Sequence, residues 1–187
     1  MVAVIAGSAA IAIAFCAEPL LYAWTGNYEL ATQAAPILRL YVLGNGCLAL
    51  AAFPYYLQYA LGDLKYHLIG NLITVVVLVP GIIFAASYYG GVGAGYVWLG
   101  LNSVILLLWA GYVHRKLVPG LHKDWLLKDI LYIVSPAIFV LCIFAAVEPN
   151  LLDRDQALAC IVISSMVTII ICALMSTYAR ALLIRRR

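Results

Sequence analysis

The chain has 187 residues, of which 66% are hydrophobic and 10% are charged. A soluble domain usually has about 45–50% apolar and about 25% charged residues, so the composition excludes a soluble domain and predicts an all-α integral membrane protein. The formal charge of +3 is small, and we expect no nucleic-acid partner.

Six apolar stretches follow one another, each about as long as the 20 residues that a membrane-spanning helix requires. We predict one transmembrane bundle of six helices over residues 2–24, 37–58, 65–86, 94–113, 126–147 and 157–179. The chain starts directly in the run VAVIAGSAAIAIAF, without the basic residue and the cleavage site of a signal peptide. We therefore expect it to be a fragment that begins inside a larger protein.

The rest of the chain is organised around residues 27–63, a mainly apolar stretch that carries Arg39, Asn45 and Gln58 and two prolines. A straight helix of this length would be about 50 Å long, against a hydrocarbon core of about 30 Å. We predict a first part that lies on the membrane surface, a bend near Pro36 and a span kinked at Pro54. Gly62 is expected to end it.

Basic residues indicate the orientation of the predicted helices. Nine of the eleven fall on one side: Lys65, Arg115, Lys116, Lys123, Lys128, Arg180, Arg185, Arg186 and Arg187. Arg154 stands alone on the other side, and Arg39 lies inside the second span. Since basic residues accumulate in cytoplasmic loops, both termini are predicted to be cytoplasmic in a multi-pass protein of the plasma membrane.

This topology predicts the result of reporter fusions. A reporter fused at Pro119 should give a cytoplasmic signal and one fused at Leu151 a periplasmic signal. The reverse pattern would contradict the topology.

Polar side chains inside the spans are functional candidates because they are costly in hydrocarbon. Asn45 and Asn102 fall near the middle of their spans, where each either bonds another helix or faces a cavity. Arg39 and Glu18 fall at similar depth in antiparallel neighbours. They either form an ion pair, or Arg39 contacts an anion and Glu18 acts as a coupling carboxylate. A third interpretation is that the Arg39 side chain snorkels to the membrane interface.

Gln58 and Asn71 flank the turn after the second span, where they either cap helices and solvate the interface or contact a substrate. The glycine-rich run 90–95 is no phosphate loop, since no strand precedes it and no lysine follows. We predict instead that Gly91 and Gly95, at small-xxx-small spacing, allow two helices to approach closely.

The sequence contains no recognisable catalytic or metal-binding set. The five cysteines lie in apolar segments without metal-ligand spacing. His114, His122 and Asp124 lie in a loop and form no nucleophile–base–orienter pattern. We therefore expect no enzymatic activity, no cofactor and no metal.

Five segments in succession resemble a known transporter family: EPLLYAWTGN, APILRLYVLGNGCLAL, PYYLQYALGD, HLIGN and YGGVGAGYVWLGLN. They resemble the polysaccharide-transporter (O-antigen flippase) branch of the multidrug/oligosaccharidyl-lipid/polysaccharide exporter superfamily. The resemblance covers roughly residues 15 to 130, and the chain is similar to the last six helices of such a two-lobed protein.

The resemblance implies that the protein translocates undecaprenyl-diphosphate-linked sugar repeat units across the bacterial inner membrane, for polysaccharides such as lipopolysaccharide O-antigen. Partners would be this lipid-linked oligosaccharide, membrane lipids and other polysaccharide-assembly proteins. Candidate substrate-binding residues are Arg39, Asn45, Asn102, Gln58 and Asn71, with Glu18 as a coupling carboxylate.

Three alternatives stay open. One is a multidrug/cation antiporter of the same superfamily, which usually relies on intramembrane carboxylates, of which the spans offer Glu18. Another is a membrane-embedded transferase acting on lipid-linked sugars, for which His114, His122 and Asp124 are the available groups. The last is a truncated remnant or an interaction subunit without activity.

Overall fold

The computed structural model describes residues 3–146 and 154–175, and in these residues it contains helices and no strand. The all-helical class predicted from composition is thus confirmed for the described part of the chain. In chain order the elements are η1 (Ala3–Gly7), α1 (Ser8–Phe15), α2 (Ala17–Thr25), α3 (Tyr28–Leu50), α4 (Ala52–Ala60), α5 (Lys65–Val104), η2 (Ile105–Trp109), α6 (Ala110–Leu117), α7 (Leu121–Trp125), η3 (Leu126–Leu131), α8 (Tyr132–Ala146) and α9 (Arg154–Met175).

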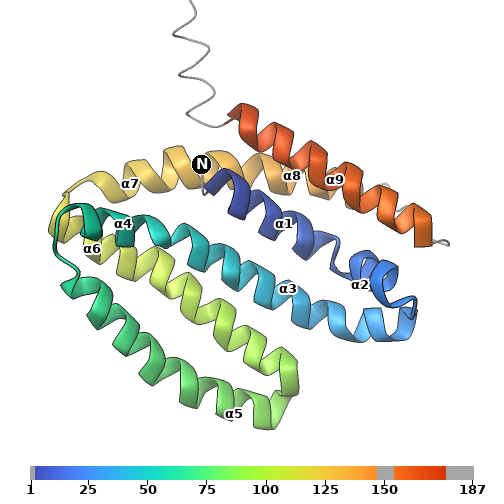
Figure 1. Cartoon of the computed structure of the whole chain (residues 1–187), viewed down its shortest axis with the longest axis horizontal. Helices are drawn as coiled ribbons and strands as arrows, with labels where there is room; N and C mark the ends of the chain where they lie inside the picture. The colour runs from blue at the N-terminus through green and yellow to red at the C-terminus, as the bar shows by residue number, and fades with distance from the viewer. Residues whose placement is uncertain (1–2, 147–153, 176–187) are drawn as a thin grey trace, which may run out of the picture.

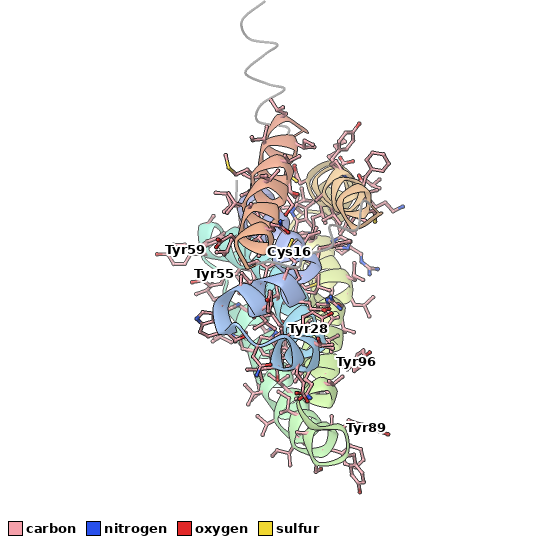
Figure 2. All side chains as sticks on the ribbon, turned by 90° about the vertical axis from the view of Figure 1, so that its right-hand side faces the viewer. Cys16, Tyr28, Tyr55, Tyr59, Tyr89 and Tyr96 are labelled. Atoms are coloured by element: carbon pink, nitrogen blue, oxygen red, sulfur yellow. The ribbon has the colours of Figure 1, made fainter. Side chains whose placement is uncertain are left out.

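α3 lies in the middle of the bundle, between α1 and the second half of α5 (Figure 1). The α4–α5 and α6–α7 connections lie at one end of the molecule, and the α2–α3 connection and the turn within α5 lie at the other. Large side chains such as Tyr59, Tyr89 and Tyr96 are exposed on the outside (Figure 2). Small residues are buried between the helices, as expected where helices associate in lipid.

The first predicted span is not a single straight helix. Two helices, Ile5–Phe15 and Ala17–Thr25, meet at an angle of 73°. Pro19 explains the break, because it has no N–H to donate to the carbonyl of Phe15 and is well tolerated in the first turn of a new helix. Gly26, with φ 69°, ends α2.

The second predicted segment differs from the prediction at Pro36 and agrees with it at Pro54. α3 begins at the cap residue Asn27, whose Oδ1 accepts the N–H of Leu30 at 3.1 Å, and it runs through Pro36 without a break. α3 therefore has no interruption at Pro36, and the position of its first part on the membrane surface stays a prediction. The helix is interrupted at Ala51, which places Pro54 in the first turn of α4, where a missing N–H costs little.

Gly62 ends the second segment as predicted, with φ 73°. The predicted loop between the third and fourth spans is much shorter than expected. α5 is helical on both sides of Gly90, where φ 60° and ψ −149° reverse the chain and make α5 a hairpin of two arms. Such backbone angles favour glycine, so one residue suffices for the turn.

The remaining helices correspond in part to the predicted spans. η3 and α8 cover residues 126–146, and α9 covers residues 154–175. Residue 2, residue 147, residues 176–179 and the fusion site Leu151 lie outside the described residues.

Two helical stretches in the described ranges are long and apolar enough to cross a membrane, Tyr28–Ala60 and Lys65–Leu117. The bent pair Ile5–Phe15 and Ala17–Thr25 is a third if it forms one span. This supports a membrane protein, and the number of six spans stays a prediction.

Glycines bring α3 and the second arm of α5 into close contact, as the small-residue spacing predicted. A Cβ atom on Gly91 would lie 2.9 Å from Ile37 Cδ1, and one on Gly95 would lie 2.9 Å from Leu40 Cβ. Gly44 of α3 faces the indole ring of Trp98 in the same way. The absence of side chains at these positions therefore sets the distance between the two helices.

Candidate functional site

Two pockets lie beside α3, and they share no lining residue. The Arg39 pocket has a volume of about 720 Å³ and lies between η1, α1, α3, η2, η3 and α8. The Asn71 pocket has a volume of about 400 Å³ and lies between α3, α4, the first arm of α5, η2 and α6. The predicted site residues are divided between these two places.

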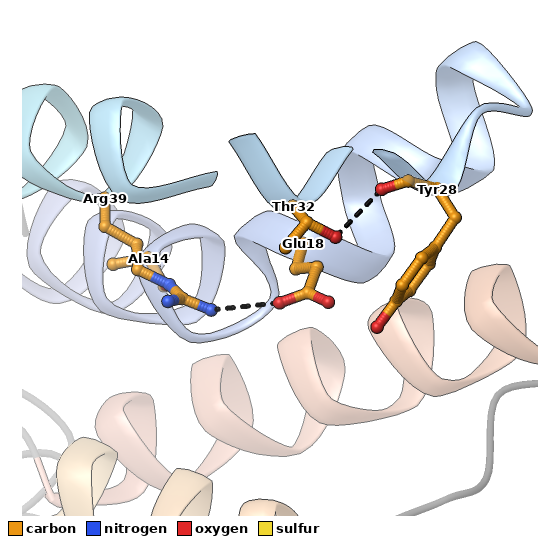
Figure 3. Close-up of polar contacts among 5 residues, drawn as sticks. All are labelled: Ala14, Glu18, Tyr28, Thr32 and Arg39. Atoms are coloured by element: carbon orange, nitrogen blue, oxygen red, sulfur yellow. Dashed lines mark hydrogen bonds and ion pairs between the residues drawn. The ribbon is translucent and has the colours of Figure 1, made fainter. Parts of the chain in front are cut away.

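Arg39 and Glu18 meet, as their predicted depths in antiparallel neighbours suggested. Arg39 Nη2 lies 3.9 Å from Glu18 Oε2, and Arg39 Nε donates a hydrogen bond to the carbonyl of Ala14 at 3.2 Å (Figure 3). The two side chains are 44% and 31% exposed. Since 3.9 Å is longer than a hydrogen bond, the terminal nitrogens of Arg39 keep donors for another anion.

The lining of the Arg39 pocket is apolar except for this guanidinium. Arg39, Leu43, Cys47 and Leu50 form one stripe along α3 and face residues of the other helices. The opposing lining comprises Gly7, Ala10, Ile11, Ala14, Phe15, Leu106, Ile130, Val134 and Ile138. A molecule that carries an anionic group on an apolar chain matches this distribution.

Gln58 lines the Asn71 pocket, and both ends of its amide are occupied. Its Oε1 accepts the backbone N–H of His67 at 2.7 Å, and its Nε2 donates to the carbonyl of Pro54 at 3.2 Å. The first bond satisfies one of the free N–H groups in the first turn of α5. Gln58 therefore caps a helix from a neighbouring one, as the capping interpretation proposed.

Asn71 and His67 form the polar surface of this pocket. Asn71 Nδ2 lies 3.0 Å from His67 Nε2, and the His67 ring lies 4.4 Å from the Tyr55 ring between centroids. The indole of Trp109 forms part of the opposite wall. Sequence reasoning missed Tyr55 and Trp109, because aromatic residues near a membrane interface are common and carry no specific signal.

The two midspan asparagines do not meet in one cavity. Asn102 is buried, and its Nδ2 donates to the carbonyl of Trp98 at 2.8 Å within α5. Asn45 is exposed. In the described part of the chain it forms no hydrogen bond with Arg39 or Asn102. It precedes Leu48 and Ala49, which line the Asn71 pocket, by one helical turn on the same face of α3.

The residues on which the transferase alternative depends form a packed cluster. His114 is fully buried between the rings of Phe53 and Trp125, and its Nδ1 lies 3.2 Å from Nδ1 of His122. Asp124 forms an ion pair with Lys128 at 3.2 Å. None of these residues lines either pocket.

Comparison with protein-family models, with curated proteins and with solved structures finds no match for this chain.

Proposed function

We propose that the chain is part of a flippase-type transporter that moves lipid-linked oligosaccharides, carried on an undecaprenyl diphosphate, across the bacterial inner membrane. The observation that carries the proposal is the Arg39 pocket, an apolar pocket of about 720 Å³ with a single guanidinium in its lining.

The substrate joins a long apolar chain to a diphosphate. An apolar chain gains free energy in a pocket lined by aliphatic side chains, and a diphosphate presents paired oxygens to the planar fork of an arginine. Arg39 has one nitrogen bonded to Ala14, which holds the side chain in place, while its terminal nitrogens are within reach of an anion. The pocket thus has the chemistry that a lipid-linked diphosphate requires.

Glu18 would couple the binding of the substrate to its release. Its carboxylate competes with a bound phosphate for Arg39, because both are anions at the same guanidinium. Binding of the diphosphate would displace Glu18 from Arg39, and the return of Glu18 to Arg39 would favour release. The loose ion pair at 3.9 Å suits such an exchange.

The position of the basic residues supports the proposed orientation. Lys65 begins α5, and Arg115, Lys116 and Lys123 lie around the α6–α7 connection, at the same end of the molecule (Figure 1). The positive-inside rule makes this end cytoplasmic. The Arg39–Glu18 pair then lies toward the periplasmic end.

A binding experiment with the purified chain tests the proposal. Undecaprenyl diphosphate should bind more tightly than undecaprenol, and Arg39→Ala should weaken the diphosphate about tenfold or more. A hydrogen bond to a charged group contributes about 1.5–3 kcal/mol, and about 1.4 kcal/mol is tenfold. Native mass spectrometry in mild detergent measures both lipids, and equal affinity for the two would contradict the proposal.

A further inference from the structure

We infer that the Asn71 pocket is a binding site for a neutral sugar, separate from the Arg39 pocket. The inference goes beyond the transport proposal, because it uses none of the residues that would contact the diphosphate. A free sugar and the sugar part of a lipid-linked oligosaccharide present the same hydroxyl groups, and the experiment below separates these two sources.

The lining of the pocket selects against charged ligands. Its fourteen lining residues include no Asp, Glu, Lys or Arg, and the one histidine among them is His67, beside Tyr55. The charge of a bound phosphate or ammonium group would have no oppositely charged carboxylate, lysine or arginine in this lining, and burying an unpaired charge costs free energy. The pocket volume is about 400 Å³, and pockets that bind small molecules usually have volumes of about 300–1,000 Å³.

The polar groups in the pocket can both donate and accept hydrogen bonds. The Asn71 amide nitrogen is a donor, so His67 Nε2 accepts in their 3.0 Å contact and the ring proton lies on Nδ1. Asn71 Oδ1 then remains an acceptor and His67 Nδ1–H a donor, and neither bonds any residue in the ranges 3–146 and 154–175. Sugar hydroxyls need donors and acceptors side by side.

Aromatic rings provide the surface on which the apolar face of a sugar ring can pack. Tyr55 comes from α4 and Trp109 from η2. Trp109 lies against Gly70, where a Cβ atom would be 2.5 Å from its Nε1, and it stacks on Tyr112 at 5.5 Å between ring centroids. These two contacts hold its indole in place at the pocket wall.

Gln58 keeps the two polar residues in position. By capping the N–H of His67, its buried amide fixes the start of α5 relative to α4. His67 and Asn71 lie one turn apart on that arm of α5. Gln58 is thus a positioning residue, and Asn71, His67 and Trp109 are the contact residues.

The test uses the full chain, purified in an amine-oxide detergent that carries no sugar. Saturation-transfer NMR follows a panel of neutral sugars, including N-acetylglucosamine and maltose, with glucose 6-phosphate as the charged comparison. At least one neutral sugar should bind saturably, and Asn71→Leu, which keeps the size of an exposed side chain, should weaken it about tenfold. Trp109→Leu should also weaken it.

The matched control is Gln33→Leu, which removes an exposed amide of α3 outside both pockets and should leave sugar binding unchanged. The inference is overturned if no sugar of the panel binds saturably, or if binding survives both Asn71→Leu and Trp109→Leu in folded protein. Circular dichroism establishes that each variant is folded.

A second arm identifies the source of the sugar. If the ligand is the lipid-linked oligosaccharide, its affinity should exceed that of undecaprenyl diphosphate, and Asn71→Leu should remove this difference while Arg39→Ala should not. If the attached sugar adds no affinity, the pocket binds free sugar. Failure of undecaprenyl diphosphate to bind refutes the transport proposal and leaves the result for free sugar intact.

Discussion

Replacing Arg39 with alanine is expected to lower polysaccharide export about tenfold or more, and replacing it with lysine should lower export less. Lysine keeps the positive charge but loses the planar fork that bonds two phosphate oxygens at once. Export is measured by complementation of a flippase-null strain with the whole reading frame that contains this chain. The membrane level of each variant is measured alongside.

Two further variants show whether Arg39 acts on the substrate. Arg115→Ala removes an exposed arginine outside both pockets and should leave export unchanged. Glu18→Gln separates the two roles of the ion pair. If Arg39 only ties α3 to α2 through Glu18, Glu18→Gln should be as harmful as Arg39→Ala, with both lowering protein abundance. Unchanged export and abundance in Arg39→Ala would exclude Arg39 from the site.

The second large effect is expected at the glycines between α3 and α5. Gly95→Ala would place a methyl group 2.9 Å from Leu40 Cβ, an atom that cannot rotate away because it is bonded to the backbone. Gly44→Ala would place one 2.8 Å from Trp98 Nε1 and 3.3 Å from the Cα of Leu99. Each should destabilise the folded chain by about 1–3 kcal/mol, the cost of overpacking.

The matched control is Gly100→Ala, on the same arm of α5, where a Cβ atom would have no neighbour within 4 Å. Because alanine is the better helix former by about 0.5–1 kcal/mol, this variant should be as stable as the parent chain or more stable. Thermal unfolding in detergent, followed by circular dichroism, measures all three. Equal stability of Gly95→Ala and Gly100→Ala would contradict the close packing.

Partial rescue gives an independent check on the Gly44 contact. Trp98→Ala removes the ring that the new methyl group would meet, so the cost of Gly44→Ala should be smaller in the double variant than in the parent chain. A coupling free energy near zero would show that Gly44 and Trp98 act independently.

Local chemistry was enough to predict several features of this chain. The helical class, the stop at Gly62 and the close approach at Gly91 and Gly95 depend on composition, on one backbone angle and on residue spacing. The meeting of Glu18 and Arg39 followed from the depths of two antiparallel neighbours. These are properties of short segments or of adjacent helices, which a sequence specifies directly.

The prolines show why local rules were not sufficient. Pro19 and Pro54 each fall in the first turn of a new helix, whereas Pro36 lies inside α3 without interrupting it. Pro36 cannot donate a hydrogen bond to the carbonyl of Thr32, and Thr32 is an exposed residue. Whether a proline breaks a helix thus depends on the packing around it.

Only the tertiary structure decided how the candidate site residues are grouped. The sequence offered Arg39, Asn45, Gln58, Asn71 and Asn102 as substrate-binding candidates, but it did not show which of them lie together. The folded chain puts Arg39 on one pocket beside α3, Gln58 and Asn71 on another, and Asn102 in a bond within its own helix. The physical reason is that depth follows from position along the chain, whereas the direction of a side chain depends on which faces of α3 are covered by α1 and α5. Those contacts join residues far apart in the sequence.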